Sequence, residues 1–303
     1  MWLVFAFSGP VLWALSTHID KYLVERFFKE SDVGVLLIFT GLIGLLPLPF
    51  IAAFEPHTLG IGALSIAVIV ASGALYMGAM FFYLRALQTE EASVISPLFQ
   101  ISPLFAYGLA WAVLGETLSA KQMLGGLLIM SSVFLISLRP RAAGRSRIKL
   151  SIVLLMAACA FTLALNSVIF KFFAIRDEFW TTSFWIFVGN VVFGAGLLLY
   201  PPYRREFFGL FKVHPYAMTT INAANELINL GGGLGVRYAM LLAPLSIVQA
   251  ISSTSPLFVF LFGIGLSLFF PALGREDLSK RSLIQKGAAA ILVIVGVVLV
   301  GPA

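Results

Sequence analysis

The tetrapeptide Ser102-Pro103-Leu104-Phe105 occurs a second time, unchanged, as Ser255-Pro256-Leu257-Phe258, 153 residues later. Further matches follow in the same order along the chain: Ala14-Leu15-Ser16 with Lys21 and Ala164-Leu165-Asn166 with Lys171, Ser93 and Ser246, and Glu116-Thr117-Leu118-Ser119 and Glu276-Asp277-Leu278-Ser279. Several matches at nearly constant spacing indicate an internal repeat. The sequence therefore predicts two copies of one unit, residues 1–140 and residues 148–303.

The composition places both copies in a lipid bilayer. Hydrophobic residues make up 60% of the chain, charged residues make up 11%, and the mean hydropathy is +0.99. A soluble domain is nearer to half apolar and about a quarter charged. A membrane-spanning helix needs roughly 20 mostly apolar residues. Ten ranges meet this condition: 2–19, 33–53, 63–85, 93–114, 121–138, 150–172, 180–200, 216–240, 245–269 and 283–301.

Helices are the expected spanning element, because backbone groups in lipid must be hydrogen-bonded within the protein and the ten-residue alternation of a β-barrel strand is absent. Five helices per copy is an odd number, so the second copy must enter the membrane inverted, as in many transporters. Of the 20 Lys and Arg residues, 16 fall in loops on one side, which the positive-inside rule places in the cytoplasm. We therefore expect a multi-pass protein of the bacterial inner (plasma) membrane with both termini on the non-cytoplasmic face.

The ends of the two copies share a further pattern. In the first copy, Leu114-Gly115-Glu116-Thr117-Leu118 and Gln122-Met123-Leu124-Gly125 follow the Ser-Pro-Leu-Phe motif, and in the second Glu276 and Gly287 take corresponding places. This pattern resembles the EamA family of the drug/metabolite transporter (DMT) superfamily over the whole chain, although Arg275 replaces the glycine before Glu276. The resemblance implies a ten-helix fold, alternating access and transport of small metabolites, but it does not identify the cargo.

The range 216–240 carries the strongest candidate for a binding site. Asn222, Asn225, Glu226 and Asn229 are spaced by three and four residues, so they share one helical face. Glu226 is near the middle of its span, where a carboxyl group is costly and usually functional. We predict that Glu226 binds a proton or a substrate ammonium. The alternative is a structural, protonated carboxyl that holds neighbouring helices together. The glycines at 231–233 and 235 predict close helix packing or, alternatively, local unwinding.

Lysines and arginines near the span ends have two interpretations. Lys21 and Lys171 are related by the repeat and either reach the membrane interface with their ammonium groups or contact an anionic group of the substrate. Asp20 is an alternative partner for Lys21. Arg85 and Arg237 are interpreted as interface anchors.

The remaining site candidates are prolines, glutamines and aromatic residues. Pro97, Pro103 and Pro256 lie within the predicted spans, where proline kinks a helix and offers a hinge for gating. Gln100 and Gln249 lie at nearly matching depths and are candidates to face the substrate. Trp13 and Tyr76, with Trp111 and Trp185, are candidates for an aromatic wall. Glu116 and Glu276 are predicted to cap helix N-termini.

These observations favour a secondary transporter of a small polar metabolite, such as an amino acid or amine, with a proton bound at Glu226 as the candidate coupling ion. Efflux of lipophilic cations is the alternative, and a channel or an intramembrane enzyme is a remote one. We expect no enzymatic activity, no cofactor and no metal, since no nucleotide-binding motif and no His/Cys cluster is present. The basic residues are expected to face lipid headgroups rather than nucleic acid, and one chain with both repeats is expected to act as a monomer. The single cysteine, Cys159, excludes an intrachain disulfide.

Overall fold

The computed structural model describes residues 1–26, 31–89, 98, 101–137, 150–269 and 279–301. Every regular element in these ranges is a helix. Within them, seven segments are long and apolar enough to cross a membrane: Trp2–Leu23, Val33–Phe54, Ala63–Ala86, Leu150–Arg176, Phe179–Leu197, Leu245–Phe269 and Leu283–Val300. Each of the ten predicted ranges overlaps a described helix, but the count of ten spans stays a prediction.

The first half of the chain forms α1 (Trp2–Arg26), α2 (Val33–Ile43), α3 (Pro47–Phe54), the short 3-10 helix η1 (Pro56–Leu59), α4 (Ala63–Thr89), α6 (Ser102–Leu114) and α7 (Ala120–Ser137). The predicted range 33–53 is therefore two helices, with a break at Gly44 before Pro47, which stands in the first turn of α3. Gly115 ends α6 in the left-handed conformation, with φ of 68°, which glycine adopts without steric cost.

The second half forms α8 (Leu150–Arg176), α9 (Phe179–Leu197), α10 (Pro201–Val213), the π-helical turn η2 (Ala217–Asn222), α11 (Ala223–Leu242), α12 (Leu245–Ser252), α13 (Ser255–Phe269) and α14 (Lys280–Val300). The predicted range 245–269 is broken at Ser253 and Thr254. Pro256 and its counterpart Pro103 each stand in the first turn of a new helix, where the missing N–H is tolerated. The two prolines therefore mark helix starts rather than kinks inside continuous helices.

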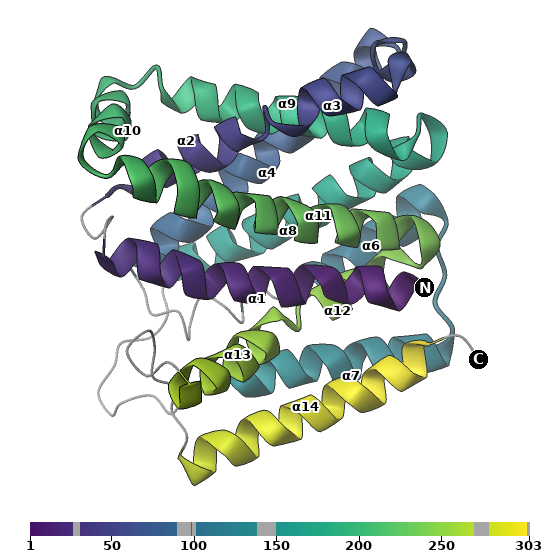
Figure 1. Cartoon of the computed structure of the whole chain (residues 1–303). Helices are drawn as coiled ribbons and strands as arrows, with labels where there is room; N and C mark the ends of the chain where they lie inside the picture. The colour runs from purple at the N-terminus through teal and green to yellow at the C-terminus, as the bar shows by residue number, and fades with distance from the viewer. Residues whose placement is uncertain (27–30, 90–97, 99–100, 138–149, 270–278, 302–303) are drawn as a thin grey trace.

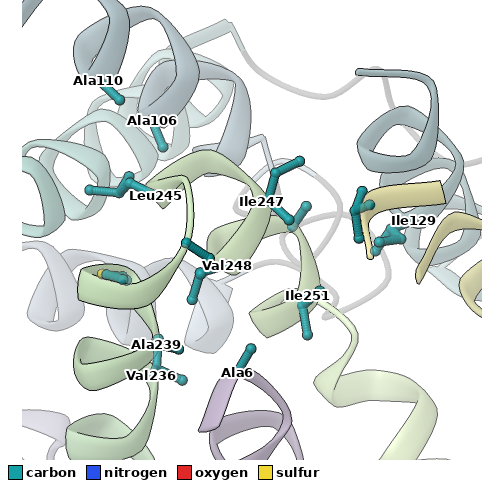
Figure 2. Close-up of a cluster of buried hydrophobic side chains, with 14 of the residues drawn as sticks. Ala6, Ala106, Ala110, Ile129, Val236, Ala239, Leu245, Ile247, Val248 and Ile251 are labelled. Carbon is teal, nitrogen blue, oxygen red and sulfur yellow. The ribbon is translucent and has the colours of Figure 1, made fainter. Parts of the chain in front are cut away.

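Helices from the two halves are interleaved in one bundle (Figure 1). α1 runs along α11, α4 packs on α8 and α9, and α7 lies beside α14. The start of α1 and the end of α14 lie at the same end of the bundle, and α10 lies at the opposite end. The short helix α12 is the centre of the largest hydrophobic core. Figure 2 shows its buried side chains among residues from α1, α6, α7 and α11: Leu245, Ile247, Val248 and Ile251 from α12, with Ala6, Ala106, Ala110, Ile129, Val236 and Ala239.

The crossing of α4 and α9 depends on two glycines. A Cβ atom on Gly73 would lie 3.2 Å from the Cα of Gly189 and closer still to the carbonyl oxygen of Ile186. A Cβ atom on Gly189 would meet the backbone of Val70 and Ala74. Because these obstacles are backbone atoms, neither helix can accept a side chain here. Small residues let membrane helices approach closely in this way.

Candidate functional site

The Glu226 carboxyl lies inside the bundle between α11 and α2. Glu226 is only 8% exposed. The Thr40 hydroxyl, from the middle of α2, donates a hydrogen bond of 2.6 Å to Oε1 of Glu226. The side chain of Asn229, one turn further along α11, also hydrogen-bonds with this carboxyl. The predicted polar face of α11 therefore points into the protein and not toward lipid.

A second carboxyl stands close to Glu226. Asn225 is fully buried, and its Nδ2 donates a hydrogen bond of 2.6 Å to Oδ1 of Asp20 in α1. Asp20 itself is exposed, and it is near enough to Glu226 for the two side chains to interact electrostatically. Two neighbouring carboxylates repel one another unless a cation or a proton is bound between them. The arrangement therefore suits binding of a positive charge.

Trp13 joins the polar face from the side of α1. Its indole Nε1 donates a hydrogen bond of 3.3 Å to the main-chain oxygen of Asn229. A Cβ atom on Gly232 would lie 3.0 Å from this indole nitrogen. The glycine run thus lets α1 approach α11, as the packing interpretation predicted, and α11 continues as a regular helix through these residues instead of unwinding.

Gly233 differs from the other glycines of the run. A Cβ atom added there would meet no atom within 4 Å. Gly233 is seven residues after Glu226, so the two lie on one face of α11. Tyr76 of α4 interacts electrostatically with Glu226. Open space, a carboxyl and a phenol are thus brought to the inner side of α11. Asn222 is buried one turn before Glu226, at 6% exposure.

Gln249 belongs to a different polar cluster. Its Nε2 donates a hydrogen bond of 2.5 Å to the hydroxyl of Ser167, which links α12 to α8. The neighbouring Asn166 donates a hydrogen bond of 2.8 Å to the hydroxyl of Ser72 in α4. The other predicted members of the pathway, Gln100 and Pro97, lie outside the described residues, as does Glu276.

Lys171 is an internal residue and not an interface anchor. Its Nζ lies 2.5 Å from Oε1 of Glu116 and donates a hydrogen bond of 2.8 Å to the carbonyl oxygen of Ala243. The second oxygen of Glu116 accepts a hydrogen bond of 2.8 Å from the backbone N–H of Leu245. Glu116 therefore caps the N-terminus of α12, a helix of the other half, and its ion pair ties α8 to the same point. The role of Lys171 as an anion contact for substrate stays a prediction. Lys21, its repeat counterpart, is exposed beside Asp20.

A third ionic cluster closes the end of the bundle near α10. Arg85 lies 3.3 Å from Asp32, and its guanidinium donates a hydrogen bond of 3.4 Å to the Tyr203 hydroxyl. The backbone N–H of Asp32 donates to Glu206 at 3.0 Å. Burial, followed by the negative charge of Asp32, raises the pKa of Tyr203. Arg85, near the end of α4, thus connects the start of α2 with α10.

The sequence did not single out Thr40, and it assigned Arg237 to the interface. The Arg237 guanidinium in fact lies against the rings of Phe170 and Phe187. A lone threonine in the apolar run 33–53 was the available signal for Thr40. Among the described residues, no group of three His, Cys, Asp or Glu side chains could hold a metal ion.

Comparison with family models gives a match for the first part of the chain. Residues 1–138 match the model of the EamA-like transporter family, a family of the DMT superfamily. EamA-like proteins are membrane transporters rather than enzymes. Together with the apolar helices, this match indicates a multi-pass integral membrane protein.

Comparison of the chain with curated proteins gives no significant match. Among solved structures, one whose description reads "Crystal structure of protein" aligns with a TM-score of 0.62 and 17% sequence identity. The alignment covers 99% of this chain and 97% of the other. At this identity, the likeness shows a shared fold and says nothing about the cargo.

Proposed function

We propose that this EamA-like protein is a secondary transporter that moves a small polar metabolite with a cationic group, such as an amino acid or amine, across the membrane. The observation that carries the proposal is the Glu226 carboxyl, which is 8% exposed and hydrogen-bonded to Thr40 of another helix. Ionisable groups at membrane depth are rare and mark substrate or proton pathways. Glu226 binds the substrate ammonium or the coupling proton, and Asp20, Asn225 and Asn229 complete its surroundings.

The transport step in this proposal is alternating access between two inverted five-helix repeats, residues 1–140 and 148–303. The interleaving of the two halves supports this, since α1 packs on α11 and its counterpart α8 packs on α4. The breaks before Pro103 and Pro256 are the proposed hinges. Transporter sites commonly lie at such a repeat interface.

The proposed orientation has both termini on the non-cytoplasmic face of a plasma membrane. The start of α1 and the end of α14 lie at one end of the bundle, away from α10, which supports a common side for the two termini. A single chain contains both repeats, so we propose a functional monomer. Trp13, which contacts Asn229 beside Glu226, favours efflux of lipophilic cations as a second candidate function.

The test is a thermal-unfolding screen of the purified protein in detergent against amino acids, amines, phosphorylated metabolites and lipophilic cations. A ligand that binds only the folded state raises its stability by RT ln(1 + [L]/Kd). We expect one class of cationic compound to raise the unfolding temperature of the wild type, and this shift to disappear in Glu226→Gln.

Glu206→Gln is the matched control. It removes the same charge from a carboxyl at the end of the bundle, and the amide oxygen can still accept the hydrogen bond of Asp32. Glu206→Gln should respond to the ligand like the wild type. Equal shifts in the wild type and Glu226→Gln would show that Glu226 does not bind the cargo. A response to lipophilic cations alone would favour the second candidate function.

A further inference from the structure

Arg237 lies inside the helix bundle and not at its rim. Its guanidinium carbon is 5.5 Å from the ring centroid of Phe170 in α8 and 5.5 Å from that of Phe187 in α9. Both rings are buried, at 1% and 5% exposure. Arg237 nevertheless keeps part of its surface accessible.

Arg237 has no anionic partner in the protein as far as the structure describes it. Among the described residues, none forms a hydrogen bond or an ion pair with its guanidinium. An arginine is always charged, and an unpaired charge at membrane depth is costly. Attraction to aromatic faces offsets only a small part of that cost. The contrast with Lys171, which has both a carboxylate and a carbonyl partner, is clear.

The position of Arg237 on α11 relates it to Glu226. Glu226, Gly233 and Arg237 follow one another at intervals of seven and four residues, so they lie on one face of the helix. Gly233, between the two charges, borders open space. Tyr76 of α4 interacts electrostatically with both Arg237 and Glu226. One face of α11 therefore presents a negative group, a gap and a positive group in that order.

We infer that Arg237 binds the anionic group of the cargo while Glu226 holds its cationic group. This inference rests on the proposed function, and it narrows the cargo to molecules that carry both charges. A guanidinium binds carboxylate or phosphate with two parallel hydrogen bonds, so both anions fit the same chemistry. The cargo is thus an amino acid or a phosphorylated amine, and a simple amine lacks half of the contacts.

The experiment measures binding of matched compounds to the purified full chain. Leucine and leucine methyl ester differ in the carboxylate, and phosphoethanolamine and ethanolamine differ in the phosphate. N-acetyl-leucine keeps the carboxylate but lacks the ammonium group of leucine. The proteins are the wild type, Arg237→Gln, Arg237→Lys, Glu226→Gln and Arg176→Gln. Arg176 is the matched control, because it also stacks on a phenylalanine, Phe172, at 3.7 Å but is exposed at the end of α8.

We expect the wild type to bind at least one of the doubly charged compounds, leucine or phosphoethanolamine, ten times or more tightly than its partner without the anion. Arg237→Gln should lose this preference, with the affinity for the doubly charged compound falling at least tenfold. Arg237→Lys should restore part of it, since lysine keeps the charge but lacks the planar fork. Arg176→Gln should behave like the wild type.

The inference is wrong if the wild type shows no preference in either pair, or if Arg237→Gln keeps it. Unfolding temperatures without ligand show whether Arg237→Gln folds, and if it does not, an unchanged preference in Arg237→Lys overturns the inference. The proposed function is tested separately, through Glu226. If Glu226→Gln binds the doubly charged compound with the affinity of the wild type, or if the wild type binds leucine and N-acetyl-leucine equally, Glu226 is not the cation site. Arg237 would then remain as the anion site.

Discussion

Gly73 in α4 and Glu226 in α11 stand 153 residues apart, at corresponding positions of the two proposed repeats. Gly73 lies against the backbone of α9, so closely that no side chain fits at the crossing. Glu226 faces α2, and there a carboxyl and the Thr40 hydroxyl meet at 2.6 Å. The same place in the fold is thus closed by backbone contact in one half and occupied by a polar side chain in the other.

In the proposed two-repeat arrangement, this difference is how one half makes room for a site. Close glycine contacts give membrane helices a rigid crossing. A carboxyl at the equivalent position prevents such a contact and requires polar partners, because an unsatisfied polar group in the membrane is costly. Gly73 therefore supports a close helix crossing, whereas the chemistry of the proposed site lies at Glu226. Arg237 and Gly233 lie on the same helix as Glu226, which extends the asymmetry along α11.

The largest expected effect on stability is at the closed crossing. Gly73→Leu places a side chain against the backbone of Ile186 and Gly189, which cannot move without separating α4 from α9. Overpacking of this kind costs about 1–3 kcal/mol, and we expect the upper end of that range here. Thermal unfolding of the purified variant in detergent measures the effect. An unfolding temperature equal to that of the wild type would show that the crossing is not close-packed.

A smaller effect, of opposite sign, is expected at Gly233. Its position borders open space, so Gly233→Ala meets no steric obstacle and gains helix propensity of at most about 1 kcal/mol. We expect a small rise in the unfolding temperature. Gly233→Leu should fold equally well but bind the cargo less tightly, because its side chain enters the space between Glu226 and Arg237. A marked loss of stability in Gly233→Ala would mean that this face of α11 is packed.

The lengths of the apolar runs were sufficient to predict where the helices lie, because a spanning helix needs a minimum apolar length. They did not reveal the break at Gly44, since apolar composition continues through it, nor the break at Ser253, where the signal was the run of Ser and Thr before Pro256 and not the length of the apolar segment. Pro103 and Pro256 were expected to kink continuous helices, whereas each stands in the first turn of a new helix, which depends on backbone geometry. The prediction of EamA-like membership, made from short motifs, is confirmed for residues 1–138.

The candidate site was predictable only in part. The polar face around Glu226 follows from helical spacing, which the sequence contains directly. The partners of a buried charge come from other helices, and the sequence does not reveal them. Lys171 and Arg237 each stand near the end of an apolar run and gave the same signal, yet one is paired with Glu116 and the other lies against Phe170 and Phe187. Thr40 gave a weak signal, because threonines in helices often bond to their own backbone.

The most direct test of the central claim, that Glu226 binds the cargo, is the initial rate of transport in proteoliposomes. The compound that stabilises the wild type in the binding screen is the substrate, and wild type, Thr40→Val, Glu226→Gln and Glu206→Gln are compared. The account predicts that Glu226→Gln lowers the rate at least a hundredfold, that Thr40→Val lowers it by a smaller factor through loss of one hydrogen bond, and that Glu206→Gln transports like the wild type. Transport by Glu226→Gln at the rate of the wild type would contradict the account.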